Sequence, residues 1–340
     1  MRKEVILITG ANGEIGHGLI THLGSNGKKN ILAMDIHPLD DCLVPFCSQF
    51  IQGDVTDANL IQNLGNDFEI QSIFHLASLL STKAEHNPEL AHHVNVDGTL
   101  NLLKLAAEES ARQQRSVKFI YPSSIAAYGF PNVKSKISAG CVAEDGWLHP
   151  ITMYGCNKLY CENLGKYYAN HYRLLAPQRS SHSVDFRCLR FPGLISAITL
   201  PTGGTSDYGP EMLHHAAQGK PYACFVREDS ILPFMVMADA VKSLLLLESA
   251  LKEKLSQSVY NVTSFSVTAQ EIYDIVIRAF PGVQITFEPH QARQSIVDSW
   301  PASVDDSAAQ RDWGWSPDYN FERSFEEYLI PAVRARYHKS

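Results

Sequence analysis

Hydrophobic positions in the first half of the chain follow two alternating spacings. Short runs rich in Val, Ile and Phe predict strands at Val5–Thr9, Ile31–Asp35, Phe50–Gln52, Ser72–Ala77, Val117–Tyr121 and Asp185–Phe191. Between the first two runs, Ile15, Leu19 and Leu23 recur every four residues, which predicts an amphipathic helix. A second helix is expected after Asn87-Pro88. Strands that alternate with helices indicate an α/β fold with a doubly wound parallel sheet.

The pattern changes after about residue 193. Segments rich in Gly and Pro, such as "FPGLIS" and "PTGGTSDYG", alternate with shorter elements, and a last helix is expected near 321–336. No flexible polar linker separates the two halves. We therefore expect a first domain at 1–192 and a smaller α/β domain at 193–340, with some chain crossing back to the first sheet. The polar segment 173–183 is expected to be a surface excursion.

Composition and charge narrow the class of protein. The 340 residues are 45% hydrophobic and 19% charged, with a net charge of −7, which argues against nucleic acid as a main partner. No apolar run approaches the ~20 residues of a membrane span, and the first segment is too poor in apolar residues for a signal peptide. Seven cysteines without a C-x-x-C pair or zinc-ligand spacing predict reduced thiols and no metal site. We therefore expect a cytoplasmic enzyme with a small-molecule substrate.

A glycine-rich segment, "ITGANGEIG", follows the first strand and opens a helix. Gly10 permits a tight turn, Gly13 lets backbone approach a pyrophosphate, and Gly16 permits close packing of helix on strand. The helix N-terminus offers free N–H groups to the phosphates. Asp35 follows Gly16 by nineteen residues, close to the ~20 expected for a ribose-binding acid. No arginine that could bind a 2′-phosphate follows it. We predict NAD rather than NADP; a loop-capping aspartate is the alternative.

Taken in order, these segments resemble the extended short-chain dehydrogenase/reductase superfamily over the full length of the chain. "TGANGEIG" is similar to its cofactor loop, "GDVTD" to its adenine-flanking turn, and "IFHLAS" to its fourth strand. "YPSSIAAYG" and "MYGCNK" resemble its catalytic serine and Tyr-x-x-x-Lys segments. The resemblance implies a Rossmann-type fold and an NAD site. The cofactor-binding residues that it implies are Gly10, Asn12, Gly13, Glu14, Ile15, Gly16, Asp35, Ile36, Asp54, Val55, Leu76, Ala77, Asn95, Tyr154, Lys158 and Leu194.

The same resemblance implies a catalytic set of Ser124, Tyr154 and Lys158. A free tyrosine has a pKa near ~10 and is a poor base at neutral pH. A nearby ammonium and the positive nicotinamide ring favour the phenolate, so Tyr154 is expected to accept a substrate hydroxyl proton while hydride leaves for nicotinamide C4. Ser124 is preferred to Ser123 because it precedes Tyr128 by four residues, where the superfamily places its catalytic hydroxyl. Tyr128 is expected to be structural.

Two departures from the superfamily concern the rim of the pocket. Ser124 and Tyr154 are thirty residues apart, more than in the relatives, so "NVKSKISAGCVAEDGW" is expected to contain an extra loop. The segment "STKAEHNP" differs from the pattern expected after Ser81, so that loop is expected to close differently.

Segments of the second half resemble one branch of the superfamily, the short-chain type of L-threonine 3-dehydrogenase. They are "LRFPGLIS", "PTGGTSDYG", "CFVREDSILPFMVMADAV" and "DSWPASVDDSAAQRDWGWSPDY". This resemblance implies oxidation of the L-threonine 3-hydroxyl to 2-amino-3-ketobutyrate, with Trp300 as a lid that excludes water. The substrate-binding residues that it implies are Ser81, Ser124, Tyr154, Gly204, Thr205 and Trp300, with Asp207 as a further candidate. Turn formation and core packing are the alternative roles for these residues.

Two other functions stay open at this point. A UDP-sugar 4-epimerase-like enzyme would use the same Ser–Tyr–Lys set, although such epimerases usually carry asparagine where this chain has Gly193. A non-catalytic NAD-sensing protein would keep the fold, but it would not need all three catalytic residues. Relatives commonly dimerise through helices near 88–110 and 151–172. Polar residues on these helices make a monomer as acceptable as a homodimer.

Overall fold

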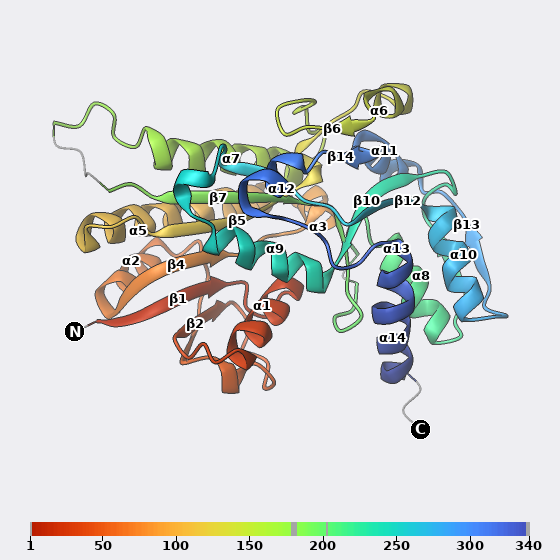
Figure 1. Ribbon diagram of the computed structural model, residues 1–340, viewed down its shortest axis with the longest axis horizontal. Coiled ribbons are helices and arrows are strands. Elements are labelled where there is room, and N and C mark those ends of the chain that lie inside the picture. Colours follow the sequence, from red (N-terminus) through yellow and green to blue (C-terminus); the bar gives the residue numbers. More distant parts are fainter. Residues whose placement is uncertain (1, 178–181, 202, 338–340) are drawn as a thin grey trace.

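A seven-stranded parallel sheet forms the centre of the computed structural model, which describes residues 2–177, 182–201 and 203–337 (Figure 1). The strand order is β11-β7-β5-β4-β1-β2-β3, so the doubly wound α/β prediction is confirmed. The strands are β1 (Lys3–Thr9), β2 (Ile31–Asp35), β3 (Gln49–Gln52), β4 (Phe68–His75), β5 (Lys118–Ser124), β7 (Asp185–Phe191) and β11 (Val259–Asn261). The order reverses between β1 and β4, and ligands of such sheets bind at the carboxyl ends of the strands beside that reversal.

Helices cover both faces of the sheet (Figure 1). Alternating side chains of the central strands pack against them. Val5 and Leu7 of β1 belong to the core under α2, α5 and α7, whereas Ile6 and Ile8 belong to the core under α1, α9 and α12. These helices are α1 (Glu14–Ser25), α2 (Ala58–Asp67), α5 (Gly98–Gln113), α7 (Met153–Asn170), α9 (Met237–Ser249) and α12 (Ser307–Trp313). Burial on both faces explains why these strands read as continuous hydrophobic runs.

Most of the second half forms a smaller layered unit beside the carboxyl ends of the large sheet (Figure 1). Its sheet has the order β12-β10-β8, and a separate pair joins β13 to β9. The elements are β8 (Gly193–Ile195), α8 (Tyr208–Ala217), β9 (Tyr222–Cys224), β10 (Ile231–Val236), β12 (Phe265–Thr268), α10 (Ala269–Ala279), β13 (Ile285–Phe287), α11 (Gln291–Ser299), α13 (Phe321–Arg323) and α14 (Ile330–Tyr337). Strand β11 lies in the large sheet next to β7. The division at residue 192 stays a prediction.

The segment between Ser124 and Tyr154, where an extra loop was expected, contains α6 (Val133–Ala139) and β6 (Cys141–Val142). Strand β6 pairs in parallel with β14 (Ser303–Val304) from the end of the chain. Figure 1 shows α6, β6, β14 and α11 gathered on one side of the molecule.

Several boundaries differ from the sequence-based expectation. β4 begins at Phe68 and ends at His75, two residues before the expected end at Ala77. The helix expected after Pro88 is three consecutive pieces: α4 (Pro88–His92), a π-helical segment (His93–Asp97) and α5. The last helix contains a similar π-helical segment. A short α3 (Ser81–His86) precedes α4. Among the described residues, no helix is long and apolar enough to cross a membrane.

Candidate active site

The turn between β1 and α1 has the geometry of a phosphate-binding loop. Gly10 has a φ of +69°, which L side chains rarely adopt, and a Cβ there would lie 2.6 Å from the Ala77 backbone nitrogen. A Cβ on Gly16 would collide with the carbonyl oxygens of Gly10 and Ala11, so only glycine lets α1 approach the turn. Gly13 caps α1 without a side chain, which leaves the first N–H groups of the helix for a ligand. This cradle fits the pyrophosphate of a dinucleotide such as NAD.

Asp35 lies at the end of β2 beside this turn. Its Oδ2 accepts a hydrogen bond from the Asn12 backbone N–H at 3.0 Å, and its Oδ1 accepts from the His37 N–H at 3.0 Å. The Asn12 side chain donates to the Pro38 carbonyl at 2.8 Å and so fixes the loop after β2. The loop-capping role raised as an alternative is therefore present, and the same bonds hold the carboxylate where a ribose-binding acid is expected.

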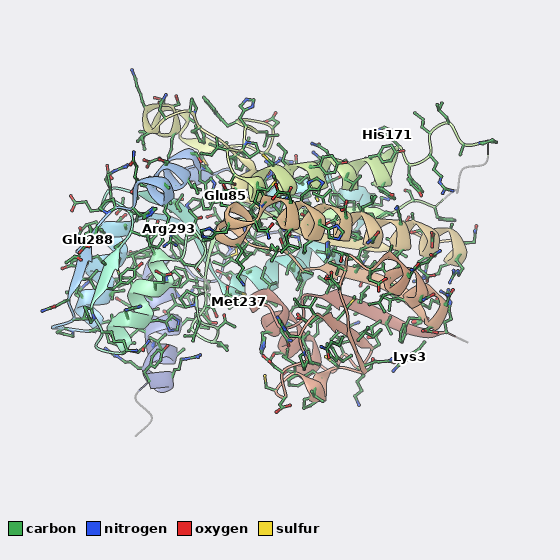
Figure 2. All side chains as sticks on the ribbon, turned by 180° about the vertical axis from the view of Figure 1, so that it is seen from behind. Lys3, Glu85, His171, Met237, Glu288 and Arg293 are labelled. Atoms are coloured by element: carbon green, nitrogen blue, oxygen red, sulfur yellow. The ribbon has the colours of Figure 1, made fainter. Side chains whose placement is uncertain are left out.

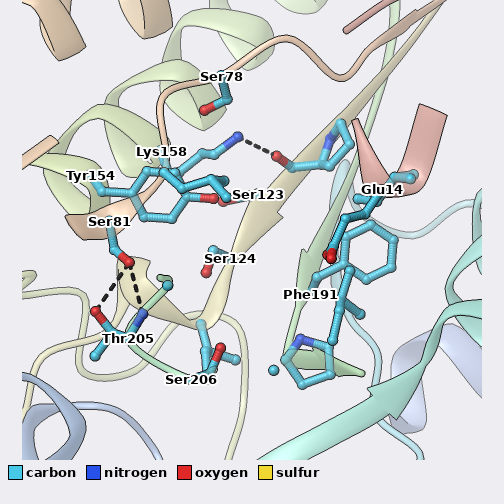
Figure 3. Close-up of a pocket in the computed structure, with 18 of the residues that line it drawn as sticks. Glu14, Ser78, Ser81, Ser123, Ser124, Tyr154, Lys158, Phe191, Thr205 and Ser206 are labelled. Atoms are coloured by element: carbon cyan, nitrogen blue, oxygen red, sulfur yellow. Dashed lines mark hydrogen bonds between the residues drawn. The ribbon is translucent and has the colours of Figure 1, made fainter. Parts of the chain in front are cut away.

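The main cavity opens at the carboxyl ends of β1, β4 and β5 and is closed on the far side by the second half of the chain (Figure 3). It brings together the expected cofactor residues Gly10, Gly13, Glu14, Ile15, Gly16, Leu76, Tyr154, Lys158 and Leu194. The other expected cofactor residues do not line it: Asn12, Asp35, Ile36, Asp54, Val55, Ala77 and Asn95. Among these, Asp54 is held in a local turn by the Thr56 N–H at 2.9 Å.

Asn95 is buried and bonds the loop that follows β4. Its Oδ1 accepts from the Leu79 N–H at 2.7 Å and from the Ser78 hydroxyl at 3.0 Å, and its amide donates to the Leu79 carbonyl at 3.0 Å. Ser78 in turn lines the cavity. In this geometry Asn95 shapes the wall of the cavity through Ser78 and Leu79.

The start of α7 is fixed at three points, and Tyr154 is the second residue of this helix. Thr152 caps the helix, since its Oγ1 accepts from the Gly155 N–H at 3.1 Å. Glu85 of α3, labelled in Figure 2, accepts from the Met153 N–H at 2.7 Å. A Cβ on Gly155 would collide with the Ala126 carbonyl, so glycine lets α7 pack against the turn after Ser124.

These contacts bring Ser124, Tyr154 and Lys158 into one cavity (Figure 3). Ser124 is the last residue of β5; its Oγ accepts from the Ala126 N–H at 3.1 Å, and its side chain opposes the rise in the pKa of Tyr154. The Lys158 ammonium donates to the Pro122 carbonyl at 2.7 Å and lies 5.4 Å from the centre of the Tyr154 ring. Their catalytic roles stay predictions.

The pKa of Tyr154 in the structure differs from the sequence-based expectation. Burial raises the pKa of Tyr154 above its usual value of 10, and the Ser124 side chain offsets only part of that rise. Burial also lowers the pKa of Lys158 to about 8, against the opposing effect of Glu162 and two neighbouring thiols. The expected lowering of the Tyr154 pKa by Lys158 is therefore outweighed by desolvation within the chain itself.

A buried ionic network lies behind the catalytic set. Glu162, one turn after Lys158 on α7, accepts two hydrogen bonds from Arg190 of β7 at 2.8 and 2.7 Å. It also accepts from the Ser123 hydroxyl at 2.6 Å. Arg190 donates further to the Tyr128 hydroxyl at 2.9 Å, and that hydroxyl donates to an asparagine of β11 at 2.8 Å. These partners suit the structural role expected of Tyr128.

Glu14 is the first residue of α1 and lines the cavity at the phosphate-binding turn. Its Oε1 accepts from the Thr199 hydroxyl at 2.9 Å. Burial, with a smaller contribution from the negative charge of Asp207, raises the pKa of this carboxyl to about 7, although the bond to Thr199 works in the opposite direction. A group that is half protonated near neutral pH therefore faces the expected pyrophosphate site.

The far wall of the cavity carries the expected substrate residues. The Thr205 hydroxyl and N–H both donate to the Ser81 Oγ, at 3.0 and 3.2 Å (Figure 3). Arg293 of α11, labelled in Figure 2, donates to the Gly204 carbonyl at 2.8 Å. Trp300 is 4% exposed and lines the cavity, as do Ser124 and Tyr154. All six expected substrate residues thus lie around one cavity.

Ser206, raised beside Thr205 as a suitable residue type, also lines the cavity. Sequence reasoning missed other residues that line it: Ser78, Leu80, Pro122, Ser123, Ile125, Phe191, Pro192 and Gly193. Most are neighbours in sequence of residues that were predicted, and three of them lie at the carboxyl ends of β5 and β7, which is the signal that points to them. Within the part of the chain that the structure describes, no group of three or more His, Cys, Asp or Glu residues gathers as a metal site.

Comparisons with known proteins agree with this geometry. The family model described as "NAD dependent epimerase/dehydratase family" matches residues 6–263. A Bos taurus relative named "L-threonine 3-dehydrogenase, mitochondrial" is 34% identical over 94% of this chain and 80% of its own length. The structure of L-threonine dehydrogenase from Clostridium difficile is 32% identical, with 99% of each chain covered and a TM-score of 0.86. A monomeric L-threonine 3-dehydrogenase from a metagenome is 33% identical, with 98% of this chain and 100% of that chain covered and a TM-score of 0.85.

Proposed function

Because this chain belongs to the NAD-dependent epimerase/dehydratase family, we propose that it is an NAD-dependent dehydrogenase that oxidises the 3-hydroxyl of L-threonine to give 2-amino-3-ketobutyrate. One observation carries the proposal. The same cavity is lined by a Ser–Tyr–Lys set and by the paired hydroxyls of Ser81 and Thr205. The similarity to proteins named L-threonine dehydrogenase supports this choice of substrate.

The proposed reaction assigns a role to each residue of the set. NAD, when bound, supplies the acceptor for the hydride that leaves C3 of the substrate. Tyr154 accepts the proton of the 3-hydroxyl, so that a carbonyl forms at C3 as the C–H and O–H bonds break. Ser124, which lines the same cavity as Tyr154, orients the substrate oxygen. Lys158, anchored to the Pro122 carbonyl, provides a positive charge beside the developing phenolate.

NAD is also the cofactor for which the chain has suitable groups. The turn of Gly10, Gly13 and Gly16 would hold the pyrophosphate, and Asp35 would accept from the hydroxyls of the adenosine ribose. A carboxylate at that position repels a 2′-phosphate, which favours NAD over NADP.

The small polar substrate fits the chemistry of the far wall. The Ser81 Oγ accepts from both the hydroxyl and the N–H of Thr205, which leaves the Ser81 O–H to donate to a substrate carboxylate. Asp207 accepts from the Gly204 N–H at 2.6 Å and so brings a negative charge close to the cavity. Trp300 covers the cavity with an apolar surface, and we propose that it excludes water during hydride transfer.

The epimerase alternative is less well supported by the residues of the cavity. A Cβ on Gly193 would lie 2.6 Å from the ring of Phe234, so the asparagine usual in UDP-sugar epimerases would not fit here without a rearrangement. For the NAD-sensing alternative, the intact catalytic set remains the counterargument.

A direct assay tests the proposal. Purified protein is mixed with NAD and either L-threonine or UDP-galactose, and the absorbance of NADH is followed, with the sugar nucleotides separated at the end. We expect NADH with L-threonine and no conversion of UDP-galactose. Conversion of UDP-galactose to UDP-glucose without NADH release would assign the protein to the epimerases, and binding of NAD without either reaction would support the sensor.

We also propose a cytoplasmic location and a monomeric or homodimeric state. All seven cysteines are free thiols, which suits a reducing compartment. Light scattering coupled to size-exclusion chromatography distinguishes the two states.

A further inference from the structure

The segment between Ser124 and Tyr154, where the sequence predicts an extra loop, is attached to the part of the chain that carries Trp300. We call residues 130–142, which include α6 and β6, the brace segment. Lys136 of α6 is 2% exposed, and its ammonium donates to the Val297 carbonyl of α11 at 3.0 Å. A lysine is almost never fully buried without a partner, so this contact has a specific structural use.

The Val297 carbonyl also accepts a hydrogen bond from the Trp300 N–H, at 3.2 Å. One carbonyl oxygen therefore joins the ammonium of Lys136 to the backbone of the residue that covers the cavity. Burial lowers the pKa of Lys136 to about 8, although a carboxylate of α11 has the opposite effect. The ammonium and the neutral amine both donate hydrogen bonds, so the contact persists in either protonation state.

The brace segment holds the chain on both sides of Trp300. Before Trp300, the Ser299 carbonyl accepts from the Phe130 N–H at 2.8 Å. After it, β14 pairs with β6 through Ser303 and Val304, and the next residue donates to the Val142 carbonyl at 2.9 Å. Figure 1 shows α6 and β6 beside α11 and β14. The backbone on both sides of Trp300 is thus held by contacts from a segment that lies between Ser124 and Tyr154 in sequence.

From this arrangement we propose that the brace segment sets the position of Trp300 and thereby limits the size of the side chain that the cavity accepts, with Lys136 as the positioning residue. The inference rests on the proposed function, because it treats the cavity as the site of a small hydroxy amino acid. Lys136 itself touches neither substrate nor cofactor in this scheme; it acts through Val297 and Trp300.

The test compares K136M with K134M. The first variant keeps the aliphatic stem but removes the donor to Val297, and the second makes the same change at an exposed position of the same helix. For K136M we expect KM for L-threonine to rise on the order of tenfold, with kcat and NADH affinity little changed. We also expect the kcat/KM ratio of 3-hydroxynorvaline to L-threonine to rise. K134M should match the wild type in all four values.

Two results would overturn the proposal. One is a K136M variant with the KM and selectivity of K134M. The other is a parallel loss of NADH affinity, kcat and melting temperature, which would indicate a general structural role. The double variant K136M/W300F adds a further check. If Lys136 acts through Trp300, the KM of the double variant should rise by less than the product of the rises in the two single variants. A rise equal to that product contradicts this route. If K136M does not fold, K136L, which also lacks a donor to the Val297 carbonyl, is compared in its place.

Amide hydrogen exchange of residues 296–304, measured by mass spectrometry without substrate, separates this inference from the proposed function. Faster exchange of this segment in K136M than in K134M supports the brace segment even if the wild type fails to oxidise L-threonine. Equal exchange in the two variants overturns the brace segment whatever the substrate is. Failure of the wild type to produce NADH from L-threonine concerns only the proposed function.

Discussion

Arg190 and Glu162 form an ion pair in the interior that is held by two hydrogen bonds. The side chain of Arg190 is 1% exposed and that of Glu162 is 0% exposed. The Nε–Oε1 and Nη2–Oε2 distances are 2.8 and 2.7 Å. Because Glu162 follows Lys158 by one helical turn and accepts from Ser123, the pair connects β7, β5 and α7 behind the catalytic set. Neither residue belonged to the site expected from the sequence, yet both lie next to residues that did.

We expect R190M to lower the free energy of unfolding by about 3–5 kcal/mol, because it leaves the carboxylate of Glu162 buried without its partner. The control is R227M, which breaks the ion pair between Arg227 and Asp298. The side chains of these two residues are 38% and 21% exposed. Loss of that pair should cost about 1 kcal/mol or less. Urea denaturation of the two variants measures the difference, and equal losses would contradict this account of Arg190.

Gly155 should tolerate no side chain. A Cβ there would collide with the Ala126 carbonyl, so G155A must push α7 away from the turn after Ser124. We expect a loss of about 1–3 kcal/mol of stability from overpacking, together with a lower kcat. G146A serves as the control, since nothing lies within 4 Å of the Cβ it would add. Thermal melts and NADH production test both effects; wild-type kcat in G155A would contradict the stated geometry.

Affinity for NAD should fall as the pH rises through 7. The pKa of Glu14 is raised to about 7, so its carboxyl is neutral below that pH and negative above it, where it repels the pyrophosphate. Between pH 6 and pH 8 we expect a loss of up to about tenfold in affinity, since one pKa unit corresponds to a factor of ten. Titration calorimetry at both pH values measures it. E14Q should remove the dependence, whereas E4Q, at an exposed position of β1, should retain it.

Y154F should reduce kcat on the order of 100-fold or more, because phenylalanine has no hydroxyl to accept the substrate proton. Binding of NADH should be preserved, since the hydroxyl is not part of the phosphate-binding turn. Y160F, on the same helix at a residue that is 54% exposed, is the matched control. Turnover in Y154F comparable with that of Y160F would refute the proton-transfer role.

The sequence predicted the large sheet well because its signals are local. Periodic apolar residues and the glycine turn identified β1, α1 and β2 within a few residues of their actual bounds. Asp35 and Tyr154 were placed by their spacing from Gly16 and Lys158, which is also local information.

Contacts between distant parts of the chain left no such signal. Lys136 meets Val297 across 161 residues, and nothing near either residue indicates the other. The sequence did contain a signal for the Glu162–Arg190 pair. Arg187 and Arg190 interrupt the apolar residues of β7, and such charged residues are buried only with partners. The opposite case is Tyr154, whose pKa depends on the total burial of its ring and therefore on the whole fold.

The chain passes from β7 of the large sheet to β8 of the small one through Pro192 alone, and it crosses in the same direction a second time between β11 and β12, through residues 262–264. Two short, stiff crossings that lie side by side join the two halves of the chain at two points. We therefore expect the halves to resist swinging apart as rigid bodies. Entry of a ligand would then depend on small local displacements at the rim, and the two halves should give a single melting transition rather than two.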